Sequence, residues 1–282
     1  MNANTAAANA ANALMQSIVT QPVLPPEASY IPMRINLQGQ DGIGKSTFAA
    51  NADKPIFIQA EDGLDFIQDV ARFPKCETWT QIYDNLTALY FTDHDYKTVV
   101  LDTTDAAHAL CETHVCEKNN WRDSEGKLSI LAPGWGNGYT AVKEQFQGLL
   151  NNLNNLREGK NMNVILLSHV HIKPHNDPNL AEPYDRWEMR CSKGVNSLIK
   201  DWVDFNLFAK FETTLSTTGN KTKGKSVGNR SLHTRFNAGF DAKSRIALPE
   251  KMPLSWPTFI DEYTKALNPA QSPETKVAKG GK

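Results

Sequence analysis

The stretch from Gly39 to Ser46, GQDGIGKS, constrains this chain more than any other, because it fits the pattern G-x-x-x-x-G-K-[ST] at every fixed position. A short apolar run precedes it and a helix-prone segment follows, which is the strand–loop–helix context that a phosphate-binding loop requires. Its glycines allow the backbone to curl, so that successive N–H groups and the positive end of the following helix face one anion. The pattern therefore predicts a site for the phosphates of a nucleotide.

Two side chains of this loop have separate predicted roles. Lys45 is expected to reach the β and γ phosphates, and the Ser46 hydroxyl is expected to ligate Mg²⁺. The other residues that we predict to contact the nucleotide are Gly39, Asp41, Gly42, Ile43, Gly44 and Thr47.

Composition limits where such a protein acts. The 282 residues suffice for one large domain or two small ones, and a hydrophobic content of 40% is enough for a substantial core. We find neither a membrane-spanning run nor a signal-peptide pattern, so we expect a cytoplasmic protein with no membrane partner. Four cysteines in a chain of this length indicate reduced thiols. The net charge of −1 means that any nucleic-acid binding must come from local basic segments.

Apolar runs alternate with helical patterns, which indicates an α/β fold whose central sheet is mostly parallel and flanked by helices. Expected strands are 33–37, 55–59, 98–101, 163–168 and 203–211, followed by an antiparallel C-terminal extension at 232–236 and 240–245. Expected helices are 64–71, 80–89, 104–118, 140–156 and 194–201. We expect one domain at 31–266, with a flexible arm at 1–30 and a disordered tail at 267–282. The arm is an alternative candidate for docking onto a neighbouring subunit.

Polar residues follow three of the expected strands. Asp102 ends a buried apolar run and is expected to support Mg²⁺, as a Walker B carboxylate does. Glu61 is expected to face the cleft and orient the water that attacks the γ phosphate, although it could instead cap a helix. Ser168 and His169 are candidates for sensing that phosphate, whereas a purely structural role for His169 is the alternative.

Lys243 and Arg245 are two residues apart in an expected extended segment, so they share one face. Such a pair of cations could enter the nucleotide site of a neighbouring subunit and neutralise charge on the transferred phosphoryl group. The alternative is a pair of solvated surface cations.

Taken in order, these segments resemble the core of the RecA-type ATPases. The residues that carry the resemblance are Ile58, Gln59, Ala60 and Glu61 with Leu64 and Asp65; Leu101, Asp102 and Thr103; Ser168 and His169, where the family usually has Gln; Ser192 to Asn196; and Lys243 to Pro249. Within this class the chain resembles phage-encoded AAA-type nucleotide-binding proteins, including the Sak-type single-strand annealing proteins. That likeness extends from residue 31 to residue 263 and includes Gly134 to Tyr139, Val142, Lys143 and Phe146.

The resemblance implies a RecA-like P-loop NTPase core that uses ATP and Mg²⁺ and acts in phage recombination or strand annealing. It implies that Glu61 is the catalytic base, with Lys45 and a neighbour's Lys243 and Arg245 as further catalytic residues. Hydrolysis would then depend on assembly into a homo-oligomer, either a filament or a ring, and DNA would stimulate it. Because His169 replaces the usual Gln, the coupling between nucleotide and DNA is expected to differ.

Two segments mix cations with aromatic side chains, the combination that binds single-stranded DNA without reading its sequence. They are 119–138 and 170–193, and the predicted DNA-binding residues are Trp121, Arg122, Lys127, Lys173, Arg186, Trp187, Arg190 and Lys193. A third segment, 219–230, is basic without aromatic residues and could contact only phosphates, or could be a solvated hairpin tip. A single-strand DNA-binding protein is a further candidate partner.

Three other interpretations compete with a DNA-dependent ATPase. One is a kinase that uses the same loop, although no arginine-bearing lid is evident. The second is a nucleotide-dependent switch that recruits a replication or recombination partner, and the third is a helicase-type motor. Separately, His108, Cys111, His114 and Cys116 have metal-binding side chains, but their helical spacing does not bring all four onto one face, so core-facing positions are expected rather than zinc.

Overall fold

A mostly parallel sheet is central to the computed structural model of this chain, which describes residues 31–218 and 221–268. Its strands follow the order β10-β8-β7-β1-β5-β4-β2-β3, while β6 pairs with β5 and β9 pairs with β7. The strands are β1 (Arg34–Gly39), β2 (Pro55–Gln59), β3 (Ala71–Arg72), β4 (Thr98–Asp102), β5 (Asn163–His175), β6 (Tyr184–Met189), β7 (Phe205–Thr218), β8 (Lys221–His233), β9 (Lys243–Ser244) and β10 (Lys251–Pro253).

The direction of the strands divides the sheet into two parts. From β7 through β1, β5, β4 and β2 to β3, each neighbouring pair is parallel. The pairs β7–β8, β8–β10, β7–β9 and β5–β6 are antiparallel. The predicted α/β fold, a P-loop NTPase core with antiparallel strands toward the C-terminus, is thereby confirmed.

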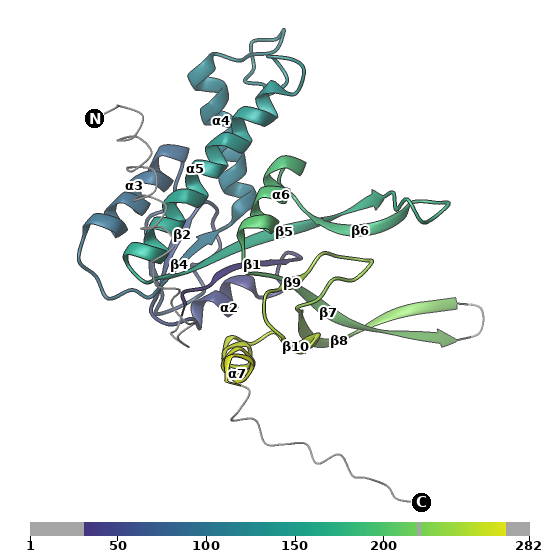
Figure 1. The fold of residues 1–282 in the computed structure, drawn as a ribbon. Helices are drawn as coiled ribbons and strands as arrows, with labels where there is room; N and C mark the ends of the chain where they lie inside the picture. Colours follow the sequence, from purple (N-terminus) through teal and green to yellow (C-terminus); the bar gives the residue numbers. More distant parts are fainter. Residues whose placement is uncertain (1–30, 219–220, 269–282) are drawn as a thin grey trace, which may run out of the picture. The chain divides into compact units, whose positions relative to one another are not determined.

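Helices cover both faces of the sheet, as Figure 1 shows. One face is covered by α3 (Trp79–Phe91), α4 (Thr104–Asn119), α5 (Asn137–Gly159) and α6 (Lys193–Trp202). The other face packs against α2 (Lys45–Ala50) and α7 (Trp256–Leu267). This two-layer cover explains why the central strands are apolar along nearly their whole length.

Alternation along each strand sends neighbouring side chains into different cores. In β2, Ile56 and Ile58 belong to the cluster under α3 to α6, while Phe57 points into the cluster under α2 and α7. The first cluster contains Phe146 of α5, and the second contains Phe259 of α7, each at most 1% exposed. Because both faces are packed, the ends of the strands are the places where polar side chains can gather.

Two helices begin at caps that are visible in the sequence. At the start of α3, the Thr78 hydroxyl accepts a hydrogen bond from the Gln81 N–H, and the Gln81 side chain accepts one from the Thr78 N–H, which forms a capping box. Ser255 caps α7, and Pro257 occupies the first turn, where proline is tolerated. We did not predict α7, although this Ser-Trp-Pro start was present in the sequence.

Several other predicted elements need correction. Residues 64–71 form turns rather than a helix, because Leu64 is buried in the core while Phe66 is 98% exposed, and Ala71 then pairs with Ile56 as the start of β3. Strands β6 and β10 were not predicted. Segment 170–193 is largely a β5–β6 hairpin instead of an open loop. The predicted arm at 1–30 lies outside the described residues, as does the predicted tail beyond residue 268.

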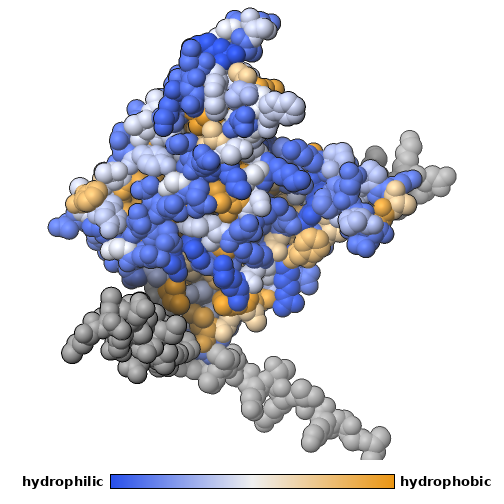
Figure 2. Space-filling view, turned by 45° about the horizontal axis from the view of Figure 1, so that its top comes forward, coloured by the Kyte–Doolittle hydropathy of each residue, from blue (hydrophilic) through white to orange (hydrophobic). Residues whose placement is uncertain are grey.

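Figure 2 shows one face, on which hydrophilic side chains predominate and hydrophobic ones gather in small groups. In the part of the chain that the structure describes, no helix has the length and apolar character needed to cross a membrane.

Candidate nucleotide site

The predicted phosphate-binding loop joins the C-terminal end of β1 to the first turn of α2. Gly44 precedes α2 with φ +103°, a left-handed conformation that favours glycine. Gly39 must also be small, since a Cβ there would lie 2.9 Å from the Ala209 carbonyl oxygen on the neighbouring strand β7. Two of the pattern's glycines therefore have identifiable backbone reasons.

A cavity of about 400 Å³ opens over this loop at the C-terminal ends of the parallel strands. Its walls come from the loop, from the segment after β2, from the ends of β4 and β5, and from β8. The lining residues are Gly42, Gly44, Lys45, Ser46, Thr47, Glu61, Gly63, Ile67, Asp102, His169 and Arg230. Ligands of open α/β sheets bind at this end of the strands, so the cavity lies where the sequence predicted it.

Lys45 is folded back onto its own loop. Its Nζ donates to the carbonyl oxygens of Gly39 and Gln40, at 3.2 and 3.1 Å. Burial lowers the pKa of this ammonium, and the nearby carboxylates of Asp102 and Asp41 oppose that shift. A cation held at the mouth of a phosphate-binding loop by weak carbonyl partners is well placed to exchange them for phosphate oxygens.

The two predicted Mg²⁺ residues are in direct contact. The Ser46 hydroxyl donates to Asp102 Oδ2 at 2.8 Å, joining the first turn of α2 to the end of β4. Asp102 is 4% exposed, and burial raises the pKa of its carboxyl while the Ser46 hydrogen bond opposes that rise. A hydroxyl and a carboxylate are hard oxygen ligands of the kind that Mg²⁺ takes, so these residues fit the ion.

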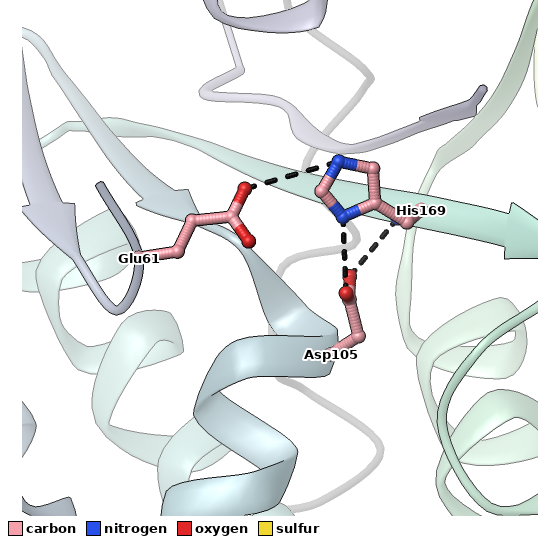
Figure 3. Close-up of side chains that lie close together, drawn as sticks. All are labelled: Glu61, Asp105 and His169. Carbon is pink, nitrogen blue, oxygen red and sulfur yellow. Dashed lines mark hydrogen bonds and ion pairs between the residues drawn. The ribbon is translucent and has the colours of Figure 1, made fainter. Parts of the chain in front are cut away.

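Glu61 and Asp105 lie on either side of the His169 ring (Figure 3). His169 Nδ1 is 3.0 Å from Asp105 Oδ2, and its Nε2 is 3.8 Å from Glu61 Oε1. The His169 backbone N–H also donates to Asp105 Oδ1 at 3.0 Å. Asp105 therefore fixes the position of the ring and leaves Nε2 facing the cavity.

The environment of Glu61 suits a group that takes up a proton. Burial raises the pKa of its carboxyl, His169 lowers it, and the carboxylates of Asp102 and Asp105 raise it further. Ligand atoms of Glu61, Asp105 and His169 all lie within 4.8 Å of one another, a distance that a metal ion could also bridge. The contacts between the ring and the two carboxylates account for this closeness without an ion.

Ser168, the other predicted sensor, is not brought to the cavity. It is fully buried, its hydroxyl donates to Asn36 Oδ1 at 2.7 Å, and it lies 2.7 Å from the Thr104 hydroxyl. Side-chain alternation along β5 sends Ser168 and His169 to opposite sides, so that His169 alone faces the nucleotide loop.

Asp41 links the loop to two further elements. Its Oδ1 lies 3.0 Å from His169 Nε2, and its Oδ2 accepts a hydrogen bond from Arg190 at 2.8 Å. Burial alone would raise the pKa of the Asp41 carboxyl, but the Arg190 hydrogen bond and the His169 ring outweigh it and lower that pKa. Arg190, predicted as a DNA contact, thus lies beside the nucleotide loop.

Lys243 and Arg245 lie at the other end of the sheet. Strand β9 pairs with the beginning of β7, where Lys243 donates to the Lys200 carbonyl and Arg245 Nε lies 3.1 Å from Asp204 Oδ1. Neither residue lines the nucleotide cavity of its own chain. A role in hydrolysis would therefore have to be exercised on a neighbouring subunit.

The predicted DNA-binding residues divide into two groups. Arg186 is only 7% exposed and forms an ion pair with Asp241, so it lacks the exposed position that a DNA contact requires. Trp121 and Trp187 each pack against a buried core cluster. Both tryptophan rings are partly buried, so only part of each remains accessible for base stacking.

Five predicted cations remain at the surface, and one of them, Arg190, contacts Asp41 as described above. Arg122 and Lys127 make only local contacts, with the Gly126 carbonyl and with Glu125. Lys173 and Lys193 share a cavity of about 530 Å³ between the β5–β6 hairpin and α6. The same cavity includes Lys200, which was not predicted.

Sequence reasoning missed two relevant positions. Asp105 was hidden because a first-turn aspartate usually serves the helix dipole alone. Arg230 was assigned to a basic hairpin and not to the nucleotide cavity that it lines. Long-range placement decides both, and no local pattern distinguishes them.

The His108–Cys116 group behaves as core packing. Cys111 and Cys116 are buried, free thiols, and the His108 ring lies 3.1 Å from the Ser192 hydroxyl. Among the described residues, these four side chains do not converge on a common point as zinc ligands would.

Comparison with known proteins shows a family match. Residues 31–246 match the model of a protein family described as an AAA domain. No curated protein matches the chain.

Proposed function

This chain belongs to the AAA domain family of P-loop ATPases, and from that premise we propose that it is an ATP- and Mg²⁺-dependent, RecA-like ATPase that binds single-stranded DNA. We further propose that it acts in phage recombination or single-strand annealing. The family implies nucleotide-dependent ATPase activity, while the DNA substrate and the biological process are our inference.

One observation carries the ATPase proposal. The Ser46–Asp102 hydrogen bond joins the two elements that hold Mg²⁺ in P-loop enzymes, within the cavity that Lys45 and Glu61 also line. Lys45 and Ser46 belong to α2, Glu61 to the segment after β2, and Asp102 to the end of β4, so only the folded sheet brings them together. When bound, Mg²⁺ would offset negative charge on the β and γ phosphates.

The residues of the chain suit distinct parts of the hydrolysis reaction. Lys45 would bind phosphate oxygens, which replace its present carbonyl partners. Glu61 would accept a proton from the water that attacks the γ phosphorus, as the P–O bond to ADP breaks. His169, held by Asp105, would place Nε2 toward the γ phosphate and respond to its presence.

The DNA proposal is supported by the surface around the β5–β6 hairpin. Lys173 and Lys193 line one cavity, where they could hold backbone phosphates. Lys200 lines it too but is paired with Asp241, and the carboxylates of Glu188 and Asp201 are on the same wall. Arg190 follows β6 directly and contacts Asp41 of the nucleotide loop. A change of contacts at Asp41 would therefore be transmitted to the hairpin, which couples nucleotide to DNA.

Assembly forms a further part of the proposal. Lys243 and Arg245 lie away from their own cavity, so they could complete the site of the next protomer in a filament or ring. Hydrolysis would then depend on homo-oligomerisation. A single-strand DNA-binding protein would be a natural accessory partner on the same substrate.

The first experiment is a steady-state measurement of phosphate release from ATP, with and without an unstructured single-stranded oligonucleotide. We expect DNA to increase the rate, and Lys45→Ala to abolish the rate in both conditions. Absence of DNA stimulation in an enzyme that otherwise hydrolyses ATP would contradict the DNA-dependent part.

Two alternatives remain and the same protein can be tested for them. A nucleotide-dependent switch is favoured by the contact of Asp41 with both His169 and Arg190, since this link needs no hydrolysis to respond to nucleotide. Slow hydrolysis unaffected by DNA, with ATP-dependent capture of a replication or recombination protein, would support the switch. Unwinding of a duplex by closed rings would instead support a helicase-type motor.

A further inference from the structure

We propose that Arg230 binds the phosphates of the nucleotide held in the cavity of its own chain. This inference rests on the proposed nucleotide site and adds a cation that neither the loop pattern nor the family match assigns. It differs from the role proposed for Lys243 and Arg245, which would act on a neighbouring protomer.

Position is the first evidence. Arg230 belongs to β8, far from the loop in sequence, yet it lines the same cavity as Lys45, Ser46 and Asp102. A Cβ placed on Gly44 would lie only 2.6 Å from Arg230 Nη1. The guanidinium thus lies against the glycine that begins α2, beside the backbone N–H groups that receive phosphate.

The anchoring of Arg230 is the second evidence. Its backbone pairs with Phe211 across the β7–β8 ladder, and its carbonyl oxygen accepts a hydrogen bond from the Leu254 N–H at 3.2 Å. The guanidinium lies over the Phe211 ring, with Cζ 5.8 Å from the ring centroid. A planar cation resting on an aromatic ring keeps its N–H edges available for an anion.

Charge in the cavity is the third evidence. Glu61 and Asp102 both line it and would repel phosphates, while Lys45 is the only lysine on its wall among the described residues. Arg230 supplies a second permanent cation. Within the described part of the chain, no carboxylate forms an ion pair with Arg230, whereas Arg34, Arg186, Arg190 and Arg245 all have one.

Calorimetric titration of the full chain with Mg²⁺ and a non-hydrolysable ATP analogue tests this inference. Arg230→Ala should weaken the affinity for the analogue by about 10- to 100-fold, since a charge-assisted hydrogen bond to phosphate is lost. Arg230→Lys should retain part of the affinity, because it keeps the charge without the planar fork. Thermal unfolding of each variant shows whether the fold is intact.

Arg235→Ala is the matched control, because Arg235 is an exposed arginine shortly after β8 that does not line the cavity. It should bind the analogue as the wild type does. Lys45→Ala separates the two proposals. If Lys45→Ala binds normally, the nucleotide site itself is wrong. If Lys45→Ala loses binding while a folded Arg230→Ala binds normally, only the role of Arg230 is overturned.

Mixing of variants tests whether Arg230 acts within its own chain. Arg230→Ala mixed with Lys45→Ala should not recover ATPase activity, because neither chain then has an intact cavity. Recovery would show that the Lys45→Ala chain supplies its arginine to a neighbour, and would overturn a role within the same chain. The pair Arg245→Ala and Lys45→Ala is the reference mixture, since a cation shared between protomers would restore activity there.

Discussion

The two ends of the parallel strands carry opposite arrangements of charge. At the N-terminal end, Arg34 of β1 donates to both carboxylate oxygens of Asp204, at 2.7 and 3.2 Å from Nη2 and Nε, and its backbone N–H adds a third bond. Asn163 Oδ1 accepts from the Met33 N–H at 2.8 Å. Each of these polar groups has a fixed partner inside the protein, and we call this the closed end of the sheet.

At the C-terminal end the polar groups share partners and face a cavity. His169 lies between Asp105, Glu61 and Asp41, while Lys45 rests on two carbonyl oxygens. Both ends belong to the same sheet, but the C-terminal end leaves charged groups available to a ligand, and we call it the open end. The comparison indicates that an ion pair joined by several hydrogen bonds fixes the position of the strands. Charged groups that share several partners can exchange one of them for a ligand.

The largest effect is expected for Arg245 at the closed end, if this residue acts on the nucleotide site of another subunit. Arg245 is 57% exposed, so Arg245→Ala should lower the free energy of unfolding by less than about 1 kcal/mol. Under assembling conditions it should nevertheless lower the ATPase rate by between about a thousandfold and a hundred-thousandfold, as loss of a trans-acting arginine does. Phosphate release at several protein concentrations measures this, and an unchanged rate would refute a shared site.

The next effect concerns the open end itself. Glu61→Gln keeps the shape of the side chain but removes its ability to accept a proton. We expect the single-turnover rate of ATP hydrolysis to fall by between about a hundredfold and ten-thousandfold. Affinity for the ATP analogue should stay close to that of the wild type, and a normal rate would remove Glu61 from the mechanism.

Removal of the Arg34–Asp204 ion pair at the closed end should lower the free energy of unfolding. Asp204→Ala leaves the Arg34 guanidinium, which is 20% exposed, without its carboxylate, and should cost about 2–4 kcal/mol of unfolding free energy. Asp95→Ala is the matched control at the same end of the sheet, because the Lys54–Asp95 pair is exposed and should contribute less than about 1 kcal/mol. Urea denaturation measures both, and equal losses would contradict the distinction.

The same pair predicts a pH dependence. Burial alone would raise the pKa of the Asp204 carboxyl, but hydrogen bonds from Arg34 outweigh it and hold that pKa below its ordinary value of 3.8. A lowered folded-state pKa means that the stabilisation is complete above that ordinary value and is lost as the pH falls through the folded-state value. The stability difference between wild type and Asp204→Ala should therefore shrink in strong acid.

The smallest effect is expected for Asp105, the residue that positions His169 at the open end. Asp105→Asn removes the carboxylate that holds His169 Nδ1, while His169 itself remains. We expect kcat to fall about tenfold, the loss of one charge-assisted hydrogen bond, with little change in nucleotide affinity. If KM rises and kcat stays constant, Asp105 serves nucleotide binding and not the position of His169.

Sequence reasoning worked where a pattern is local or lies in the strands. The phosphate loop, the apolar runs of β2, β4 and β5, and the Asp102 strand end are predicted because each is a short pattern imposed by backbone geometry. It was less successful where packing competes with exposure. Arg186 looks like a nucleic-acid contact in the sequence, but its side chain is buried and paired with Asp241.

By itself, therefore, the sequence determined that this chain has a nucleotide loop on a parallel α/β sheet, since glycine spacing and apolar runs act over a few residues. The tertiary structure decided which charged side chains meet. Asp105 comes from the start of α4, Arg190 from the segment after β6 and Arg230 from β8, and all three lie near the loop only because their strands and helices pack around β1. Contacts between residues so distant in sequence depend on the fold as a whole, and no local pattern encodes them.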